Sequence, residues 1–343
     1  MVRRVVNIVA ATGLFLLFSS ICFGQTTFGS LGGTVRDTSG GVIPGVQVTL
    51  TNLGTNTKVR TTTNTDGIYE FVNVQPGNYR VEAEKGGFKL FSRSPVVVET
   101  QQSYRIDVTM QLGSVTQTVQ VTAATPLLQP QTSSLGQVIA GRSVTEMPLN
   151  GRNVFNLMEL VPSVVPQGES EGTPTGANPF GWNNYQINGA FGGQSAIYLD
   201  GVPLTGSGYI NMVNLFPSQD TVQEFKVQTD NLGPEWGRFA GGVMTLTTKS
   251  GTNQIHGEAY EYLRNAVLNS NTFYGNQAGI PTPPFTQNQF GANAGGPLVI
   301  PGIYNGKDKT FWFFGWEGFR LRQGYTFTDT MPTPAENSGD LAA

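Results

Sequence analysis

Residues 222–257 read VQEFKVQTDNLGPEWGRFAGGVMTLTTKSGTNQIHG and separate two unlike parts of the chain. The sequence predicts one strand over 224–229 and a second over 243–249. A loop rich in Gly and Pro that carries Trp236 joins them, and Gly251 follows the second. Short β-rich segments precede this stretch, whereas long aromatic segments follow it. We therefore interpret it as the junction between a compact domain and the beginning of a larger one.

The composition restricts the classes of function. Charged residues are 13% of the 343 residues, Gly occurs 44 times, and the net charge is −3. Soluble domains usually hold ~25% charged residues, and this chain has no basic footprint for nucleic acid. Cys22 is the only cysteine and His256 the only histidine. We expect no enzyme, with no catalytic residue, no cofactor site and no metal site, because thiolate or histidine chemistry would depend on one residue each.

The N-terminus has the pattern of a secretory signal peptide. Arg3 and Arg4 precede an apolar run over 5–18, and small residues lead to Gly24. The run is shorter than the ~20 residues of a spanning helix. We predict a signal peptide over residues 1–24 that is cleaved after Gly24. Lipidation at Cys22 is an alternative, although the residues before it fit a lipidation signal poorly.

Residues 25–112 alternate between short strands and tight turns. In VQVTLTN, Val46, Val48 and Leu50 share one face, and IYEFVNV and YRVEAEK follow the same rule. Turn sequences such as NTDG over 64–67 separate them, which predicts a β-sandwich. The runs GTVRDTSGGVIPGVQVTL and TDGIYEFVNVQPGNYRVEAEKGGF resemble the carboxypeptidase regulatory-like domain. That resemblance implies a transthyretin-like sandwich with a carbohydrate-binding-like fold. The peptidase's zinc-binding histidines are absent, so it implies no peptidase activity.

Residues 113–134 read as a linker that contains one alternating strand. This strand has two interpretations, the last edge strand of the sandwich or a coupling segment. Its sequence TVQVTA resembles the TonB box of outer-membrane transporters, which implies a TonB-type energy-coupling protein as partner. Such a segment adds as a strand to the edge of the partner's sheet, so that backbone pairing supplies the affinity. The candidate coupling residues are Thr118, Val119, Gln120, Val121, Thr122 and Ala123.

Residues 135–250 form a second predicted module with both helix and strand. NVFNLMEL over 153–160 predicts a short helix that Pro162 limits, and residues 167–182 form a long loop rich in Gly and Pro. Long loops inside compact domains are usually functional or disordered. The candidates for ligand contact at the end of this loop are Trp182, Asn183, Asn184 and Tyr185, although aromatic side chains there serve equally well as structural anchors.

Three sequence blocks of this module carry a second resemblance. ING over 187–189, IYLDGVPL over 197–204 and the stretch 222–249 are similar to the plug domain of TonB-dependent receptors in their Oar-like branch. The resemblance implies an α+β plug. The chain departs from the family at Asn188, where many plugs carry Arg, and in the loop 232–237. Both departures put specificity for siderophores in doubt.

Residues 251–343 contain three strand candidates, over 256–264, 289–300 and 310–322. Their lengths are near the ~9–11 residues of a membrane-spanning strand, and the third is dense in Phe and Trp, like an aromatic girdle. We expect the first strands of a transmembrane β-barrel; a further soluble sandwich is the alternative. Because closed bacterial barrels need about eight strands, we also expect the N-terminal part of a longer protein or a truncated gene.

These observations predict a mainly β protein in the order signal peptide, sandwich, linker, plug and incomplete barrel. The function expected is that of a TonB-dependent receptor in the Gram-negative outer membrane, with its N-terminal domain facing the periplasm. Its partners would be a TonB-type protein, outer-membrane lipid and an extracellular ligand that is a carbohydrate, a peptide or a chelate. The alternative is a secreted or surface protein for carbohydrate binding or adhesion.

Overall fold

The computed structural model describes residues 27–114, 118–122, 134–166, 185–191, 193–204, 213, 215–237, 239–271, 273–324, 331 and 337–339. The predicted signal peptide and its cleavage after Gly24 lie outside these residues. The chain forms two compact units, Met1–His256 with Ala294–Phe314, and Gly257–Asn293 with Gly315–Ala343. None of the helices in the described part is both long and apolar enough to cross a membrane.

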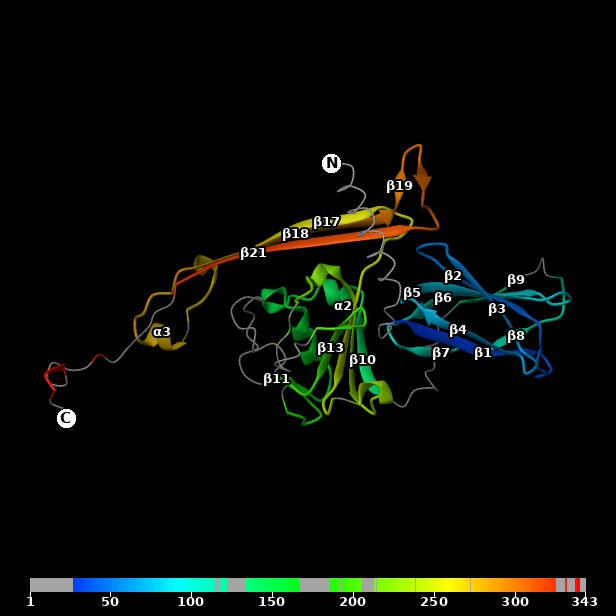
Figure 1. Ribbon diagram of the computed structural model, residues 1–343, viewed down its shortest axis with the longest axis horizontal. Helices are drawn as coiled ribbons and strands as arrows, with labels where there is room; N and C mark the ends of the chain where they lie inside the picture. The colour runs from blue at the N-terminus through cyan, green and yellow to red at the C-terminus, as the bar shows by residue number, and fades with distance from the viewer. Residues whose placement is uncertain are drawn as a thin grey trace, which may run out of the picture. The chain divides into compact units, whose positions relative to one another are not determined.

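Two sheets form the N-terminal module, called the sandwich below (Figure 1). The first sheet has the order β4-β1-β7, with β8 also paired to β1, and the second has the order β3-β2-β5-β6-β9. The strands are β1 Gly29–Asp37, β2 Gln47–Asn52, β3 Lys58–Thr62, β4 Ile68–Val74, β5 Gly77–Glu84, β6 Leu90–Val98, β7 Ser103–Arg105, β8 Val108–Met110 and β9 Thr118–Thr122.

Alternation of side chains builds the sandwich core. In the second sheet Val48 pairs with Ala83 and Leu50 with Val81, and all four are at most 1% exposed. The turn before β4 is closed by Asn64, whose Oδ1 accepts the N–H groups of Asp66 and Ile68 at 3.0 and 2.8 Å. Gly67 completes this turn at φ +69°, a conformation that side chains disfavour. Local sequence therefore specifies both the inward face and the turn.

A mixed five-stranded sheet, called the central sheet below, organises the second module (Figure 1). Its order is β10-β15-β16-β13-β14, in which only β13 and β16 run parallel. The strands are β10 Leu135–Ala140, β13 Ala196–Leu199, β14 Val202–Pro203, β15 Val222–Asp230 and β16 Val243–Thr248. A separate pair is formed by β11 Val164–Pro166 and β12 Tyr185–Ile187. The predicted strands at 224–229 and 243–249 are thus β15 and β16.

Short helices cover the apolar face of the central sheet. Phe225 and Val227 of β15 are fully buried in one core cluster with Phe155, Leu157 and Met158. The predicted helix at 153–160 is a 3-10 helix, and Asn153 caps it by accepting the N–H of Phe155 at 3.0 Å. The helices are α2 Arg142–Thr145, η2 Asn150–Arg152, η3 Val154–Leu160, η4 Gln219–Thr221, η5 Pro234–Trp236, η6 Ala266–Leu268 and α3 Phe273–Gln277.

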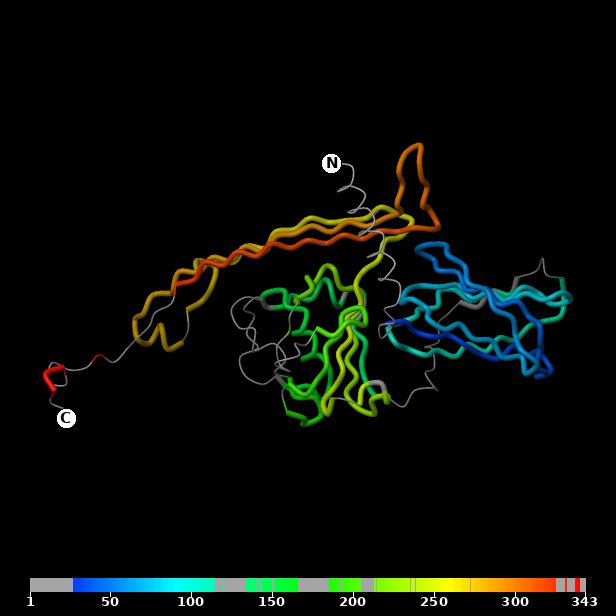
Figure 2. The backbone as a smooth tube through the Cα atoms, in the orientation of Figure 1, coloured from blue at the N-terminus to red at the C-terminus, as the bar shows by residue number. Residues whose placement is uncertain are grey.

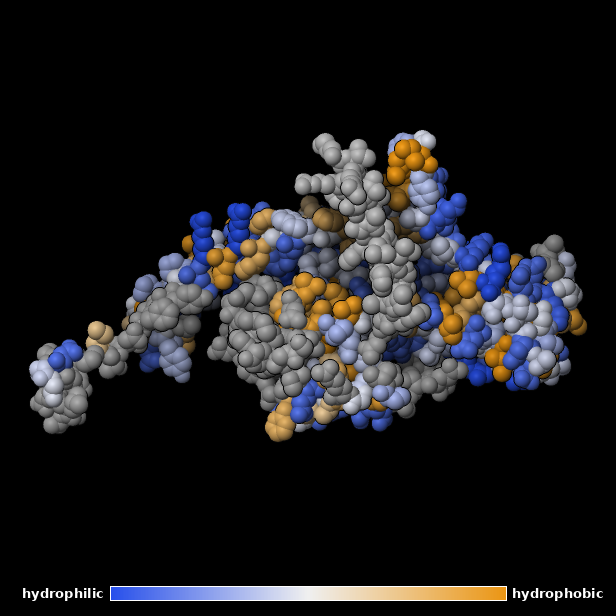
Figure 3. Space-filling view, viewed as in Figure 1, coloured by the Kyte–Doolittle hydropathy of each residue, from blue (hydrophilic) through white to orange (hydrophobic). Residues whose placement is uncertain are grey.

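The last segment contains a three-stranded sheet of long strands in the order β17-β18-β21. The strands are β17 His256–Asn265, β18 Phe285–Pro297 and β21 Phe311–Gln323. Both β18 and β21 have 13 residues: β18 begins four residues before the predicted strand at 289–300, and β21 lies within one residue of the predicted strand at 310–322. Between β18 and β21 lies a small hairpin, β19 Val299–Ile300 with β20 Tyr304–Asn305. Figure 2 traces this hairpin between β18 and β21, and Figure 3 shows its apolar surface, where Ile303 is 82% exposed.

The two faces of the long strands differ in chemistry. On one face, Glu317 accepts hydrogen bonds from Tyr260 and Gln289 at 2.8 and 2.9 Å. On the other, the rings of Phe290 and Trp316 meet edge to face with centroids 5.6 Å apart. Adjacent residues of a strand point to opposite faces, so Phe311, Phe313 and Phe319 share the face of Glu317. The faces therefore differ in the polar groups around Glu317 and not in their aromatic content, and the described residues do not close a barrel.

Candidate functional site

The predicted coupling segment is a strand of the sandwich. Residues Thr118–Thr122 form β9, which pairs in parallel with β6 from Leu90 to Ser94. Among the described residues no strand pairs with the other edge of β9, which ends the order of its sheet. The segment therefore lies where the first interpretation places it, at the edge of the sandwich. The edge that no described strand occupies is available for a partner strand, as the coupling interpretation requires. Ala123 lies outside the described residues.

The predicted ligand-contact residues are only in part described. Trp182, Asn183 and Asn184 lie outside the described residues. Tyr185 is 2% exposed in the core of the second module, with its hydroxyl 3.4 Å from Asn156 Oδ1. Burial raises the pKa of the Tyr185 hydroxyl. Because its ring is buried, Tyr185 has the position of a structural anchor and not that of a residue in contact with an external ligand.

A turn of the sandwich, residues 99–102 between β6 and β7, contacts the polar face of the central sheet. We call it the docking turn. The backbone N–H and the hydroxyl of Thr100 both donate to Glu224 Oε2 at 2.7 Å. The Thr100 hydroxyl also lies 2.8 Å from that of Thr247. Glu224 and Thr247 are opposite each other on β15 and β16. One sandwich residue thus contacts two neighbouring strands of the central sheet.

The next residue of the docking turn continues the contact along the same face. Lys226 Nζ donates to the Gln101 carbonyl at 2.8 Å, and the Thr245 hydroxyl donates to Gln101 Oε1 at 3.3 Å. Gln101 has φ +53°, in the left-handed region that few side chains adopt. This conformation places its carbonyl and its side-chain amide against the same sheet.

The docking contact buries opposite charges. Glu224 is 5% exposed and Lys226 is 3% exposed. Burial raises the pKa of the Glu224 carboxyl above its ordinary value of 4.5, and the hydrogen bonds from Thr100 offset part of this increase. Of the nearby charges, Glu99 raises the pKa of Glu224 and Lys226 lowers it. A buried charge of this kind is tolerated only when hydrogen bonds and counter-charges satisfy it. The docking turn supplies the hydrogen bonds.

The raised pKa predicts that docking depends on pH. A carboxyl whose pKa is higher when docked than in water binds its proton more tightly in the docked form. Docking is therefore strongest below pH 4.5 and weakens as the pH rises through the raised pKa of Glu224. We expect protection of the β15 amides from hydrogen exchange, corrected for intrinsic rates, to increase from pH 7 to pH 5. The other titratable groups around this carboxyl are Glu99, Tyr104, Lys226 and Lys249.

The matched control for this pH dependence is Glu224→Gln, which keeps a hydrogen-bond acceptor and removes the titration. In that variant the protection of β15 should stay constant over the same pH range. An equal pH dependence in the variant and the wild type would assign the effect to one of the neighbouring groups instead.

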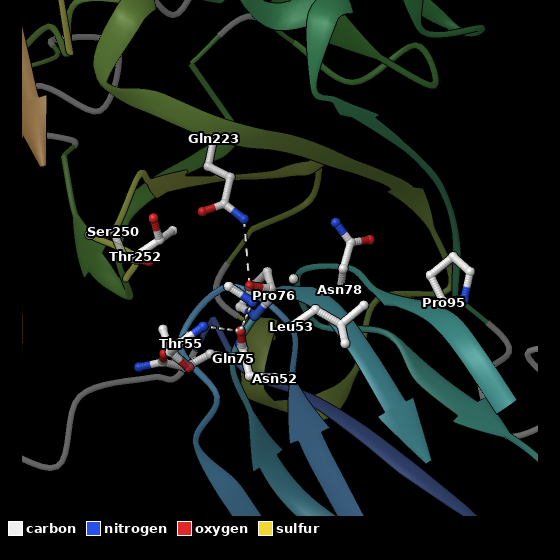
Figure 4. A pocket seen from close by; sticks show the side chains of 13 residues that line it. Asn52, Leu53, Thr55, Gln75, Pro76, Asn78, Pro95, Gln223, Ser250 and Thr252 are labelled. Atoms are coloured by element: carbon white, nitrogen blue, oxygen red, sulfur yellow. Dashed lines mark hydrogen bonds between the residues drawn. The ribbon is translucent and has the colours of Figure 1, made fainter. Parts of the chain in front are cut away.

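A pocket of about 590 Å³ lies beside the docking contact (Figure 4). It is bounded by Asn52 at the end of β2, by Asn78 at the start of β5, by Gln223 of β15 and by the segment from Ser250 to Thr252. Gln223 reaches across it, with Nε2 3.5 Å from the Pro76 carbonyl. Amides, hydroxyls and prolines line it and charged side chains do not, so its walls suit neutral hydrogen-bonding groups.

The segment that leaves the central sheet is attached to two other loops through Asp308. Asp308 Oδ1 accepts from Asn56 of the sandwich at 3.0 Å and from Asn253 at 2.7 Å. In return the Asp308 N–H donates to Asn253 Oδ1 at 2.8 Å. His256, just beyond, is exposed and lies near no catalytic partner, and the described residues contain no His, Cys, Asp and Glu group able to hold a metal.

Two family models match separate parts of the chain. A carboxypeptidase regulatory-like domain matches residues 30–111, and an outer membrane beta barrel domain matches residues 247–343. The TonB-dependent transporter Oar of Myxococcus xanthus is 26% identical over 341 residues. That similarity covers 95% of this chain and 30% of the transporter, so the chain spans less than a third of the relative's length. The matches confirm the resemblance to the carboxypeptidase regulatory-like domain and to Oar-like TonB-dependent receptors, and they support an outer-membrane location. The plug domain and the coupling segment stay predictions.

Solved structures show weaker similarity. The siderophore receptor PirA of Acinetobacter baumannii has a TM-score of 0.37 and 19% identity, covering 57% of this chain and 26% of that chain. The ferric enterobactin receptor PfeA of Pseudomonas aeruginosa has a TM-score of 0.34 and 17% identity, covering 49% and 23%. A dioxygenase domain from a Streptomyces species has a TM-score of 0.22 and 11% identity, covering 26% and 84%. TM-scores this low do not establish a shared fold.

Proposed function

We propose that this chain, a homologue of the TonB-dependent transporter Oar along 95% of its length, belongs to an outer-membrane receptor that a TonB-type protein opens. In this proposal the second module is the plug, and the long strands begin the barrel that the plug closes. The observation that carries it is the edge of β9 that no described strand occupies; in the sequence, β9 lies between the other sandwich strands and the central sheet. The transporter homology favours a receptor over an enzyme.

The proposed mechanism begins with strand addition at β9. A strand of the TonB-type protein would pair with the open edge of β9 through backbone hydrogen bonds. Tension on the chain after β9 would next reach β10, which is an edge strand of the central sheet and pairs only with β15. Pulling an edge strand away from its sheet breaks the hydrogen bonds of a single ladder one after another. A pull from the periplasm would thereby loosen the plug without unfolding the sandwich.

The ligand would act from the extracellular side of the membrane, opposite to the pull from the periplasm. An extracellular carbohydrate, peptide or chelate would contact plug and barrel loops, with Trp182, Asn183 and Asn184 as the predicted contacts. Outer-membrane lipid would face the side of the barrel strands that holds Phe290 and Trp316. The barrel-family match over 247–343 favours this membrane-embedded receptor over a released carbohydrate-binding or adhesion protein.

The coupling step can be tested without knowing the ligand. Binding of the purified periplasmic domain of the cell's TonB protein to the full-length receptor is measured by calorimetry. Deleting residues 118–123 should weaken binding more than tenfold, because the strand that pairs is gone. The double variant Val119→Pro and Val121→Pro should do the same, because proline lacks the N–H that a ladder requires.

The matched control is Val119→Ala with Val121→Ala, which keeps every backbone donor. It should bind within a fewfold of the wild type. Full binding after the deletion would refute β9 as the coupling segment, and equal loss in the alanine and proline variants would show that side chains, and not backbone pairing, carry the recognition.

A further inference from the structure

The contact between the sandwich and the central sheet is polar. The buried apolar side chains form separate clusters in the sandwich and in the second module, and no cluster contains residues of both. The two modules are instead joined by hydrogen bonds of Thr100 and Gln101 to the face of β15 and β16. Permanent interfaces are mostly apolar, whereas polar interfaces of small area are typical of modules that separate.

The same contact is narrow. Pockets of about 590 and 480 Å³ flank Gln223, and each is lined by residues of both modules. Gly77 and Asn78 of the sandwich border both pockets. Between these pockets the modules touch at the docking turn and where Gln223 Nε2 lies 3.5 Å from the Pro76 carbonyl. Separation would expose little apolar surface, which keeps its hydrophobic penalty small.

Seating of the docking turn has a local consequence for the central sheet. Thr100 bridges β15 and β16 through Glu224 and Thr247, and Gln101 bridges the same two strands through Lys226 and Thr245. Two strands that share partners in this way cannot slide or separate until the turn leaves. When the turn leaves, water can solvate Glu224 and Lys226, so the charges that are buried in the docked form become hydrated.

We infer that the docking turn is a releasable latch on the central sheet. While it is seated, it clamps β15 to β16; when it is withdrawn, the two strands become free to rearrange. The sandwich is thus a regulatory module of the sheet beside it. This inference concerns contacts inside the chain and holds whether or not a TonB-type protein acts on β9.

The test locks the latch with a disulfide. Cysteines replace Thr100 and Thr247, whose hydroxyl oxygens are 2.8 Å apart, in a chain whose only other cysteine is Cys22 of the predicted signal peptide. Hydrogen exchange of the β15 and β16 amides is measured on the full-length protein before and after reduction. We expect oxidation to slow exchange in both strands about tenfold and reduction to restore the wild-type rate. The matched control pairs Thr100→Cys with Thr229→Cys at the far end of β15, which should not cross-link.

A second comparison uses Glu224→Ala and Glu224→Gln. The alanine variant leaves the Thr100 donors without their acceptor and should speed exchange of β15 and β16 about tenfold, whereas glutamine keeps an acceptor and should not. Equal exchange in the oxidised and reduced disulfide variants would overturn the latch, as would failure of the pair to cross-link. A loss of TonB binding in the β9 variants leaves these results unchanged, so the two proposals fail separately.

Discussion

Replacing Phe225 with alanine is expected to destabilise the central sheet by about 3–5 kcal/mol, the usual loss for a buried phenylalanine. The Phe225 ring is fully buried, in one core cluster with residues of η3 and with Leu246, its cross-strand partner on β16. Its removal leaves a cavity between the central sheet and the short helices on its apolar face, the face opposite the docking turn. We expect the second module to open while the sandwich stays folded.

Local exchange measurements suit this prediction, because a chain with several modules does not unfold as one cooperative unit. Hydrogen exchange of β15 and β16 should approach that of unprotected amides in Phe225→Ala, with β2 and β5 unchanged. The control is Phe191→Ala, since Phe191 is 75% exposed. Its effect should stay within about 0.5 kcal/mol. Protection of β15 at the wild-type level in Phe225→Ala would contradict the assigned core.

Replacing Gly251 with alanine is the second large effect we expect. Gly251 follows the central sheet, and a Cβ atom there would lie 2.3 Å from the Trp312 carbonyl oxygen and 2.8 Å from that of Gly296. Both obstacles are backbone atoms, which cannot rotate away like a side chain. Overpacking of this kind costs about 1–3 kcal/mol and sometimes more. Residues 250–256, which lead from the central sheet to β17 and are called the exit segment below, should therefore move away from β18 and β21 and lose their fixed position.

In the wild type, the hydrogen bonds between Asn253 and Asp308 hold the exit segment in place, and loss of this position can be measured as protease cleavage. Gly251→Ala should increase protease cleavage after the central sheet, within residues 250–256, at least tenfold, in keeping with the clash. Gly86→Ala is the control, because a Cβ at Gly86 would meet nothing within 4 Å. Cleavage at the same rate in both variants would show that the close approach at Gly251 is not required.

The strands that sequence predicts are those with strict alternation. β2, β4 and β5 lie where VQVTLTN, IYEFVNV and YRVEAEK place them, and β13 and β14 pair across Asp200-Gly201 of the block IYLDGVPL. β7 and β8 have three residues each, too few for a period to be recognised, and the sequence LGQVIA of β10 does not alternate strictly. β10 in particular is a strand because β15 offers its edge, which is a property of a partner almost ninety residues away.

The candidate site was predictable only in part. The alternation in TVQVTA predicts a strand, and the structure puts Thr118–Thr122 in one, but pairing with β6 depends on the whole sheet. Tyr185 follows a polar loop in the sequence, yet its side chain is in the core because β12 pairs with β11. No local signal marks Thr100 as a partner of Glu224, since 124 positions separate them.

Sequence by itself predicted a mainly β chain with a carboxypeptidase regulatory-like domain and the beginning of a barrel, because strand period, turn residues and family resemblance are all local properties of the chain. It also predicted β15 and β16 as strands, and the structure pairs them so that Glu224, Lys226, Thr245 and Thr247 share one polar face. Only the tertiary structure decided that this face is covered by the docking turn of the sandwich and not by water. Alternation distinguishes one face of a strand from the other; burial of the polar face depends on what another part of the chain places over it.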